Sequence, residues 1–144
     1  MEAFLGEFPH TLDDKGRLVL PAKHRAIFEE GAVIAAGQAK CLAVYTHKEW
    51  ETVVERTKEM ARAGGDGMIA ARTIFALASG VVPDKQWRVS IPPSLREHAG
   101  LDRDVVVIGN VTHIEIWDKE VWAGERARGQ ALLSGGGNLP GILV

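Results

Sequence analysis

Two short motifs in this sequence combine an acidic and a basic side chain at the same spacing. Asp13 is followed four residues later by Arg17, and Asp84 is followed four residues later by Arg88. A carboxylate in such a position can accept amide hydrogens within a tight turn. The planar guanidinium of arginine can bind phosphates or the guanine edge in a DNA groove. The chemistry that these side chains indicate is the binding of an anion.

Two interpretations of the motifs remain open at this point. In the first, each Asp–Arg pair is an intramolecular salt bridge that fixes a turn and binds no ligand. In the second, the turn presents its arginine to an anion, with Lys15 or Lys85 beside it. The two interpretations are compatible, because an aspartate can orient the arginine that binds.

The other reactive side chains form no catalytic or metal-binding pattern. The five histidines lack the short spacing of a zinc signature, and Cys41 is the only cysteine. The sequence has no nucleophile elbow, and its glycine-rich stretch after Ser134 lacks the lysine of a P-loop. We therefore expect that the protein is not an enzyme and that it binds no cofactor, no metal and no small-molecule substrate. His24 and His98 are expected on short surface helices.

The two motifs belong to a longer duplicated segment. Residues 12–25, LDDKGRLVLPAKHR, match residues 83–96, PDKQWRVSIPPSLR, at a constant offset of 71 residues. Residues 41–50 match residues 113–122 at an offset of 72, so one residue is gained between the two blocks. Similarity at a fixed offset indicates one structural unit that is present twice.

Each copy has the same order of expected elements. A short strand leads to the motif turn and to a second strand, which ends at Pro21 or Pro92 because proline cannot donate to a sheet ladder. A short helix is expected next, at residues 22–28 and 93–99. Two strands rich in valine and isoleucine follow, and then the hydrophobic period becomes helical. We expect these later helices at residues 47–63, 68–78 and 118–129, and a flexible glycine-rich tail at 134–144.

Length and composition fit a small protein outside the membrane. The chain has 144 residues, of which 46% are hydrophobic and 25% are charged, as is typical of soluble globular proteins. The apolar segment 68–82 contains Arg72 and is shorter than the roughly 20 residues that span a bilayer. The first residues do not resemble a signal peptide, and a lone cysteine suits a reducing cytoplasm. We expect a cytoplasmic protein.

The repeats define a domain organisation. Units of about 50 residues bury too little surface to be stable alone, so we expect them to fuse or to oligomerise. The net charge of −2 disfavours a simple cationic nucleic-acid binder, but the acidic excess lies mainly in residues 104–128, outside the motifs. We predict a first repeat at residues 4–51, a helical connector at 52–79, a second repeat at 80–124, and a helix end with the tail at 125–144.

The duplicated residues closely resemble the MraZ family of bacterial transcriptional regulators. The segments that carry the resemblance are FLGEFPHTLDDKGRLVLPAKHR, DKQWRVSIPPSLREHAGL and VVVIGNVTHIEIWDKEVW, which run from Phe4 to Trp122. The resemblance implies two tandem SpoVT/AbrB-like units, each with an Asp-x-x-x-Arg motif. It also implies an α+β, β-rich fold, in which a pseudo-twofold axis pairs the units into one swapped-hairpin β-barrel and helices follow each repeat.

The same resemblance implies a function and partners. Such a protein would form ring-like homo-oligomers and bind tandem repeats in double-stranded DNA. These repeats would lie upstream of the division and cell-wall gene cluster, which the protein would repress, at the nucleoid. The DNA-binding residues that the resemblance implies are Asp13, Lys15, Arg17, Asp84, Lys85 and Arg88.

One residue departs from the family pattern. Trp87 precedes Arg88, whereas Gly16 precedes Arg17. If the backbone at this position requires a positive φ, tryptophan is strained there by about 1–2 kcal/mol. Trp87 would not be strained if the second turn differs from the first, or if this position never required glycine.

Other paired residues have simpler expected roles. Arg25 and Arg96 are expected on solvated helix faces, and Tyr45 and Trp117 in the core. Trp50 and Trp122, at helix starts, are expected to anchor the core or a subunit contact.

Three classes of function remain open from the sequence. The first is a DNA-binding repressor. The second is a structural or protein-interaction oligomer whose motifs only stabilise turns, with an AbrB antitoxin-like module as a variant that the short tail fits poorly. The third is an enzyme, for which the sequence offers no nucleophile–base pair. Salt separates the first two classes, because each phosphate contact steepens the fall of log affinity with log salt by about 0.9.

Overall fold

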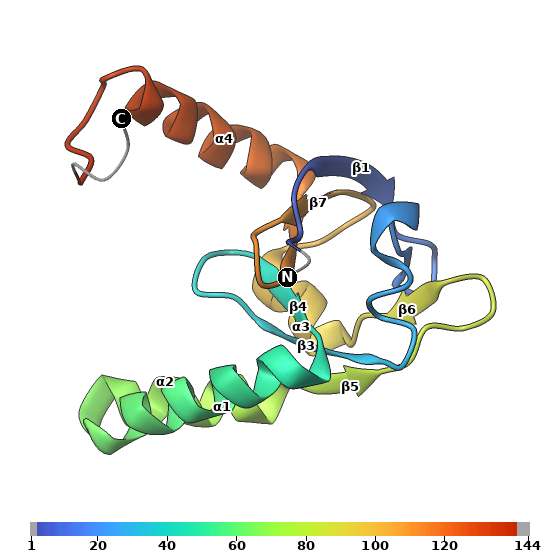
Figure 1. The fold of residues 1–144 in the computed structure, drawn as a ribbon, viewed down its shortest axis with the longest axis horizontal. Helices are drawn as coiled ribbons and strands as arrows, with labels where there is room; N and C mark the ends of the chain where they lie inside the picture. Colours follow the sequence, from blue (N-terminus) through green and yellow to red (C-terminus); the bar gives the residue numbers. More distant parts are fainter. Residues whose placement is uncertain (1–2, 141–144) are drawn as a thin grey trace.

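The structure is a computed structural model that describes residues 3–140. Figure 1 shows helix α4 and the α1–α2 hairpin extending to the same side of the strands, with β6 on the opposite side. The elements within the described residues are β1 (Glu7–Thr11), β2 (Arg17–Val19), the 3-10 helix η1 (Ala22–His24), β3 (Ala32–Ala36), β4 (Leu42–Tyr45), α1 (His47–Arg62), α2 (Gly65–Leu77), β5 (Ser79–Val81), β6 (Arg88–Ser90), α3 (Pro93–Ala99), β7 (Asp104–Gly109), β8 (Ile114–Asp118) and α4 (Lys119–Leu133).

The strands of each repeat pair mainly with strands of the other repeat. A six-stranded sheet has the order β1-β7-β8-β4-β3-β5, and a two-stranded sheet joins β2 to β6. Strand β1 pairs with β7 of the second repeat, and β5 pairs with β3 of the first. When each strand is replaced by its counterpart, the order of the large sheet reads the same backwards. The predicted α+β fold, with two repeats swapped about a pseudo-twofold axis, is confirmed.

The axis passes through two residue pairs. In the small sheet, Leu18 lies opposite Val89, and these two residues are each other's counterparts in the duplication. In the large sheet, Ala43 lies opposite Glu115, which are also counterparts. The two sheets are linked by a bridge between Leu12 and Leu18, so the strands surround a common interior.

One hydrophobic core serves both repeats. It is filled by counterpart residues from the two units, so neither unit has a core of its own, in agreement with the small size of each. Because all of these side chains are buried together, the two motifs are held on one rigid body. The core pairs include Leu20 with Ile91, Leu42 with Ile114, Val44 with Ile116, and Phe28 with Ala99.

The register of the strands shows that the offset of the repeat varies along the chain. His10 pairs with Val105, and its counterpart Val81 pairs with Ala32. Ala32 is therefore the counterpart of Val105, at an offset of 73. The second unit gains two residues before β7 and loses one in the β7–β8 turn, where the sequence comparison detected only the net gain of one.

Three predicted helices differ in length from the observed ones. The expected helix at 22–28 is only a 3-10 turn, η1, followed by further turns. Its counterpart α3 ends on Gly100 in the left-handed conformation, with φ 61°, and the first copy has Glu29 at that position. Since a left-handed C-cap favours glycine, the first copy cannot end a helix in the same way. Helix α2 begins at Gly65, after Gly64 with φ 70°, and α4 continues to Leu133.

Candidate nucleic-acid interface

The first motif forms a tight turn between β1 and β2. The Asp13 carbonyl accepts a hydrogen bond from Gly16 N at 3.0 Å, and Asp13 N donates to the Arg17 carbonyl at 3.0 Å. Asp13 Oδ1 accepts from Lys15 N at 3.0 Å and from Arg17 N at 2.9 Å. Asp13 Oδ2 accepts from Arg17 Nε at 2.6 Å. The backbone hydrogen bond from Arg17 and the guanidinium of the same residue lower the pKa of Asp13.

The second motif repeats this geometry. Asp84 Oδ1 accepts from Gln86 N at 2.8 Å and from Arg88 N at 2.9 Å, and Oδ2 accepts from Arg88 Nε at 2.8 Å. The intramolecular salt bridge of the first interpretation is thus present in both turns. Gln86, not Lys85, is the counterpart of Lys15. Both lysines are exposed at the turns.

Each salt bridge leaves half of the guanidinium uncommitted. The aspartates contact only Nε of Arg17 and of Arg88. The Nη groups of these two arginines make no hydrogen bond to any residue within 3–140. An arginine that is oriented through Nε can present its Nη groups to a ligand, so the salt bridge does not exclude anion binding.

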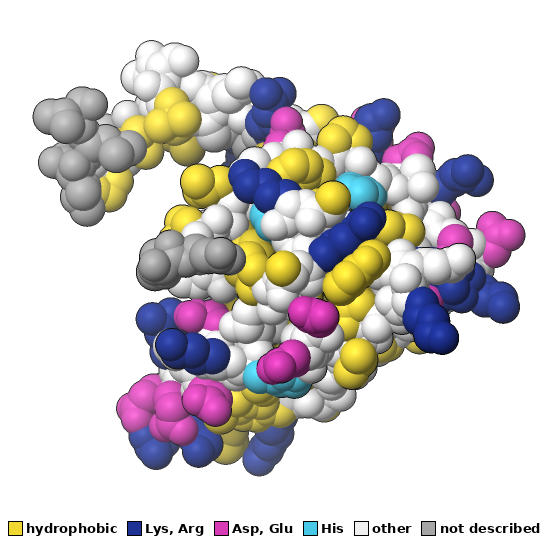
Figure 2. Space-filling view, turned by 45° about the vertical axis from the view of Figure 1, so that its right-hand side comes forward, with side chains coloured by type: hydrophobic (Ala, Val, Ile, Leu, Met, Phe, Trp, Pro, Cys, Tyr) yellow, Lys and Arg dark blue, Asp and Glu magenta, His cyan; other side chains and the backbone are white. Residues whose placement is uncertain are grey.

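The two arginines lie on one face of the β2–β6 ribbon. Leu18 and Val89 point into the core, so the residues on either side of them point outward. In the ribbon, Arg17 lies opposite Ser90, and Arg88 lies opposite Val19. In Figure 2, Lys and Arg side chains with acidic ones among them line the right-hand side of the molecule. Both motif arginines line one shallow hollow. The residues that form it are Thr11, Leu12, Asp13, Asp14, Arg17, Val19, Arg88 and Arg103.

Main-chain hydrogen bonds lock each turn to the other repeat. Ile91 N donates to the Gly16 carbonyl at 3.0 Å, and Leu20 N donates to the Trp87 carbonyl at 2.8 Å. Each motif turn is thereby fixed against the strand that follows the other motif. The relative position of the two arginines is set by backbone and does not depend on long side chains.

The position before each motif arginine requires a positive φ. Gly16 has φ 73° and Trp87 has φ 61°. The backbone bonds of the two turns are the same, so the second turn does not relax to suit its tryptophan. Trp87 is therefore held in a conformation that costs a side-chain-bearing residue about 1–2 kcal/mol.

Arg25 and Arg96 do not lie on fully solvated helix faces, which corrects the prediction. Both side chains are half-buried, and their Nε atoms donate at 3.1 Å to the carbonyls of Leu20 and Ile91, respectively. A β-carbon added to Gly16 would lie 2.6 Å from the Arg96 guanidinium carbon, so the Arg96 side chain covers the first turn. The sequence did contain a sign of this contact, the Pro-x-x-x-Arg spacing that both repeats share. At this spacing, each arginine can donate to the carbonyl of the residue directly before its proline.

His24 is buried, which also corrects the prediction. Its side chain is 1% exposed and lies edge-on to Phe4 and Phe8, with ring centroids 5.0 and 5.4 Å away. Its Nε2 has no hydrogen-bond partner among the described residues. Burial, and then the charge of Lys23, lower the pKa of His24. His98 is exposed, as predicted.

The paired aromatic residues hold the helices to the outer face of the large sheet. Trp117 is buried and Tyr45 is half-buried. Trp50 lies 5.8 Å from Tyr45 and Trp122 lies 5.4 Å from Trp117, measured between ring centroids. Both helix-start tryptophans are half-buried, so they anchor α1 and α4 rather than fill the core.

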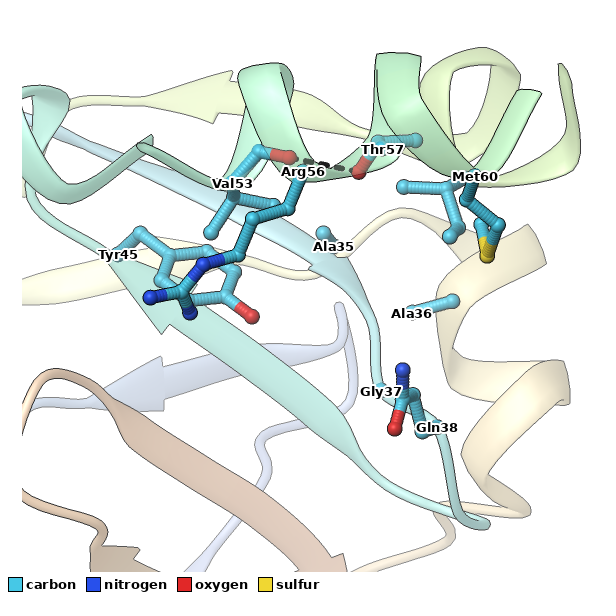
Figure 3. Close-up of a pocket in the computed structure, with 10 residues that line it drawn as sticks. Ala35, Ala36, Gly37, Gln38, Tyr45, Val53, Arg56, Thr57 and Met60 are labelled. Carbon is cyan, nitrogen blue, oxygen red and sulfur yellow. Dashed lines mark hydrogen bonds between the residues drawn. The ribbon is translucent and has the colours of Figure 1, made fainter. Parts of the chain in front are cut away.

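A second concavity lies between the β3–β4 hairpin and helices α1 and α2. Figure 3 shows Tyr45, Val53, Arg56 and Met60 around it, with Thr57 donating to the Val53 carbonyl at 2.7 Å. Arg56 is the one charged side chain among its lining residues. This lining offers no pair of groups for acid–base or nucleophilic chemistry.

Two kinds of feature are absent from residues 3–140. No helix there is both long enough and apolar enough to cross a bilayer. No group of three histidine, cysteine or acidic side chains in that range could hold a metal ion.

The sequence of this chain matches a known protein family. A family model described as "MraZ protein, putative antitoxin-like" matches residues 3–67 and 74–128. The chain belongs to the MraZ family. Both Asp-x-x-x-Arg turns lie within the matched residues, and the resemblance seen in the sequence is confirmed.

Full-length relatives within the MraZ family support the assignment. Three of them bear the name "Transcriptional regulator MraZ". The Micrococcus luteus protein is 44% identical over 131 residues, which cover 91% of this chain and 92% of the relative. The Salinispora tropica protein is 46% identical over 119 residues, covering 83% and 84%. The Paenarthrobacter aurescens protein is 41% identical over 142 residues, covering 97% and 99%.

Proposed function

We propose that this chain is a sequence-specific DNA-binding transcriptional regulator. One observation carries the proposal. Arg17 and Arg88 stand on the same face of the β2–β6 ribbon, each oriented through Nε by its own aspartate and each with Nη groups that are unpaired within the described residues. The names of the family relatives agree with such a role.

We infer different tasks for the motif residues from their contacts. Asp13 and Asp84 orient the arginines and do not contact DNA, because a carboxylate repels phosphate. Arg17 and Arg88 present two Nη donors each, which suits the O6 and N7 acceptors of guanine or a phosphate. The exposed Lys15 and Lys85 contact backbone phosphates and strengthen binding without reading sequence.

The finer parts of the proposal concern assembly and target. The chain acts as a ring-like homo-oligomer at the nucleoid, on tandem repeats upstream of the division and cell-wall gene cluster, and represses transcription there. A ring repeats the two-arginine face many times. Weak contacts to single repeats then combine, because each further contact is intramolecular.

The test is a fluorescence-anisotropy titration against the organism's own upstream region, with scrambled DNA of equal length. The proteins are wild type, Arg17→Ala, Arg88→Ala, the double variant, and Arg72→Ala as a matched control. Arg72 is an exposed arginine on α2, the helix that extends away from β6 in Figure 1. We expect specific, salt-sensitive binding that Arg72→Ala retains and the double variant loses. Unchanged binding by a correctly folded double variant would refute the proposal.

The second candidate function is a structural or protein-interaction oligomer. It is favoured by the bonds of Asp13 Oδ1 and Asp84 Oδ1 to the turn backbone, which stabilise the fold whether or not DNA binds. In that case Arg17→Ala would unfold the chain or dissociate the oligomer, and wild type would bind no DNA. Size-exclusion chromatography of the same variants distinguishes the two candidates.

A further inference from the structure

A third arginine, Arg103, is anchored beside the first motif. It lies in the connection between α3 and β7, directly before Asp104, the first residue of β7, which pairs with Thr11 at the end of β1. The Arg103 carbonyl accepts a hydrogen bond from Leu12 N at 2.8 Å. Leu12 immediately precedes Asp13, so the backbone of Arg103 is fixed next to the motif turn.

Arg103 lines the same hollow as the two motif arginines. It is exposed and forms no ion pair with any residue in the range 3–140. Without it, the charged lining would be balanced, with the acids Asp13 and Asp14 against the bases Arg17 and Arg88. With Arg103 the hollow has one cation in excess, and that cation is not engaged by a carboxylate.

The second motif has no equivalent of Arg103. The strand register makes Ala32 the counterpart of Val105, and therefore makes Glu30 the counterpart of Arg103. Pro83 stands where Leu12 stands in the first unit, and it has no N–H to donate. The second motif thus lacks both the anchoring bond and the cation, and it has a carboxylate instead.

Because of this difference, the two motifs should not interact equally with a polyanion such as DNA. The backbone of the two turns is the same, so the two motif arginines alone would allow the chain to lie on DNA in either direction. A cation at one side and a carboxylate at the other favour the direction that brings a phosphate to the cation. The asymmetry requires no movement of the protein.

We propose that Arg103 binds a DNA phosphate beside the first motif, and that Arg103 together with Glu30 sets the orientation of the chain on its DNA element. This inference rests on the proposed DNA-binding function. Arg103 is then a phosphate-contacting residue, and Glu30 acts by repulsion from the opposite end of the site.

The first test is the salt dependence of binding. Arg103→Ala removes one phosphate contact, so the slope of log affinity against log salt should fall by about 0.9 on specific and on scrambled DNA. The affinity ratio of wild type to variant should narrow roughly threefold between 50 and 200 mM salt. Arg72→Ala is the charge-matched control and should keep the wild-type slope. An Arg103→Ala slope equal to that of wild type would overturn the proposal.

The second test is a variant that should gain a phosphate contact, so it does not rely on weakened binding. Glu30→Arg supplies the second motif with the missing cation and should steepen the slope by about 0.9. Glu30 is exposed, so the substitution adds no buried charge. A Glu30→Arg slope no steeper than that of wild type would count against the role of this position.

Orientation is measured directly with a tethered DNA-cleaving iron chelate. Asp102→Cys and Glu29→Cys place the probe at exposed residues directly before Arg103 and Glu30, respectively. The native Cys41 is 2% exposed, and burial raises its pKa to about 12, so it will not compete for the label. On DNA with a single repeat, each probe should cut one flank only, and the two probes should cut opposite flanks.

The outcomes separate this inference from the proposed function. In the exchange variant, Arg103→Glu with Glu30→Arg, the two cleavage patterns should swap flanks. Equal cleavage of both flanks by each probe in the wild-type background would overturn the orientation claim while leaving DNA binding intact. If wild type binds no DNA at all, the proposed function fails first, and this inference fails with it.

Discussion

At the scale of single residues, the motif aspartate has two separate tasks. Oδ1 of Asp13 accepts two backbone amides and closes the turn, whereas Oδ2 accepts only the Arg17 guanidinium. The same division holds for Asp84. The two interpretations that the sequence left open therefore describe two atoms of one carboxylate. A structural role for Oδ1 does not argue against a binding role for the arginine that Oδ2 orients.

The second residue-scale feature is the strained Trp87, which glycine should replace without loss of stability. Trp87→Gly relieves the positive φ but loses the contacts of a half-buried indole. Trp87→Ala loses the same contacts and keeps a β-carbon at positive φ. We expect the glycine variant to be more stable than the alanine variant by about 1 kcal/mol, and at least as stable as wild type. Urea unfolding of the three proteins checks this.

The control for this prediction lies in the other turn. Gly16→Ala introduces the same strain and also places a β-carbon against the Arg96 guanidinium. It should destabilise the protein. If Trp87→Gly instead lowers stability by several kcal/mol, the indole contributes core packing that outweighs its backbone strain.

The buried His24 should make folding sensitive to mild acid. Its folded-state pKa is lowered by burial, below the value of about 6.5 expected in the unfolded chain. As the pH falls through 6.5, the unfolded state takes up the proton first, so stability decreases until the folded-state pKa is reached. His24→Leu should lose less stability than wild type between pH 7.5 and pH 5.5, measured as urea midpoints.

His10 provides the comparison for His24. Burial and the charge of Arg25 lower the pKa of His10 as well, so part of the wild-type pH dependence should remain in His24→Leu. The His10→Gln, His24→Leu double variant should be flatter than either single variant. Equal pH profiles for wild type and the double variant would show that neither histidine is linked to folding in this range.

At the scale of elements, the sequence predicted the type of almost every segment. Pro21 and Pro92 marked the ends of β2 and β6, and the change of hydrophobic period marked the start of α1. The predicted length of η1 was wrong, because a helix end depends on the conformation that one residue such as Gly100 can adopt. The predicted end of α4 was also wrong, since the helix continues to Leu133. The burial of His24 had no local signal, since it depends on Phe4 and Phe8 from a distant strand and its approach.

The candidate site was predicted only in part for a similar reason. The motif residues were visible as a spacing within each unit. Arg103 was not, because its place beside Asp13 depends on the pairing of β1 with β7 from the other repeat. A duplicated sequence indicates that two units exist, but the partner of each strand is a tertiary property.

The swapped strands predict that the two repeats unfold together. Leu18 is fully buried on the pseudo-twofold axis, opposite Val89. Leu18→Ala should cost about 2–5 kcal/mol, since it leaves a cavity at a position where the two units meet. Urea unfolding should remain a single transition by both fluorescence and circular dichroism. Val89→Ala should behave alike, and two resolved transitions in either variant would mean that the repeats fold independently.

At the scale of the whole molecule, joining the two units in one chain permits differences that a dimer of identical units cannot have. Trp87 differs from its counterpart Gly16, and Arg103 differs from its counterpart Glu30, although the fold around them is nearly symmetric. A strictly symmetric site would suit a palindromic element. An asymmetric site suits direct repeats, in which every copy of the element points the same way.

The proposed ring then predicts that spacing between DNA repeats matters as much as their sequence. If subunits of one rigid assembly hold neighbouring repeats, those repeats must lie on the same face of the duplex, and one turn is about 10 base pairs. Inserting 5 base pairs between two repeats turns the second away and should reduce affinity to that of a single repeat. Inserting 10 base pairs should restore most of the affinity in the anisotropy titration. Equal affinities for the two insertions would mean that each subunit binds its repeat independently, and that combined contacts within one assembly contribute nothing to binding.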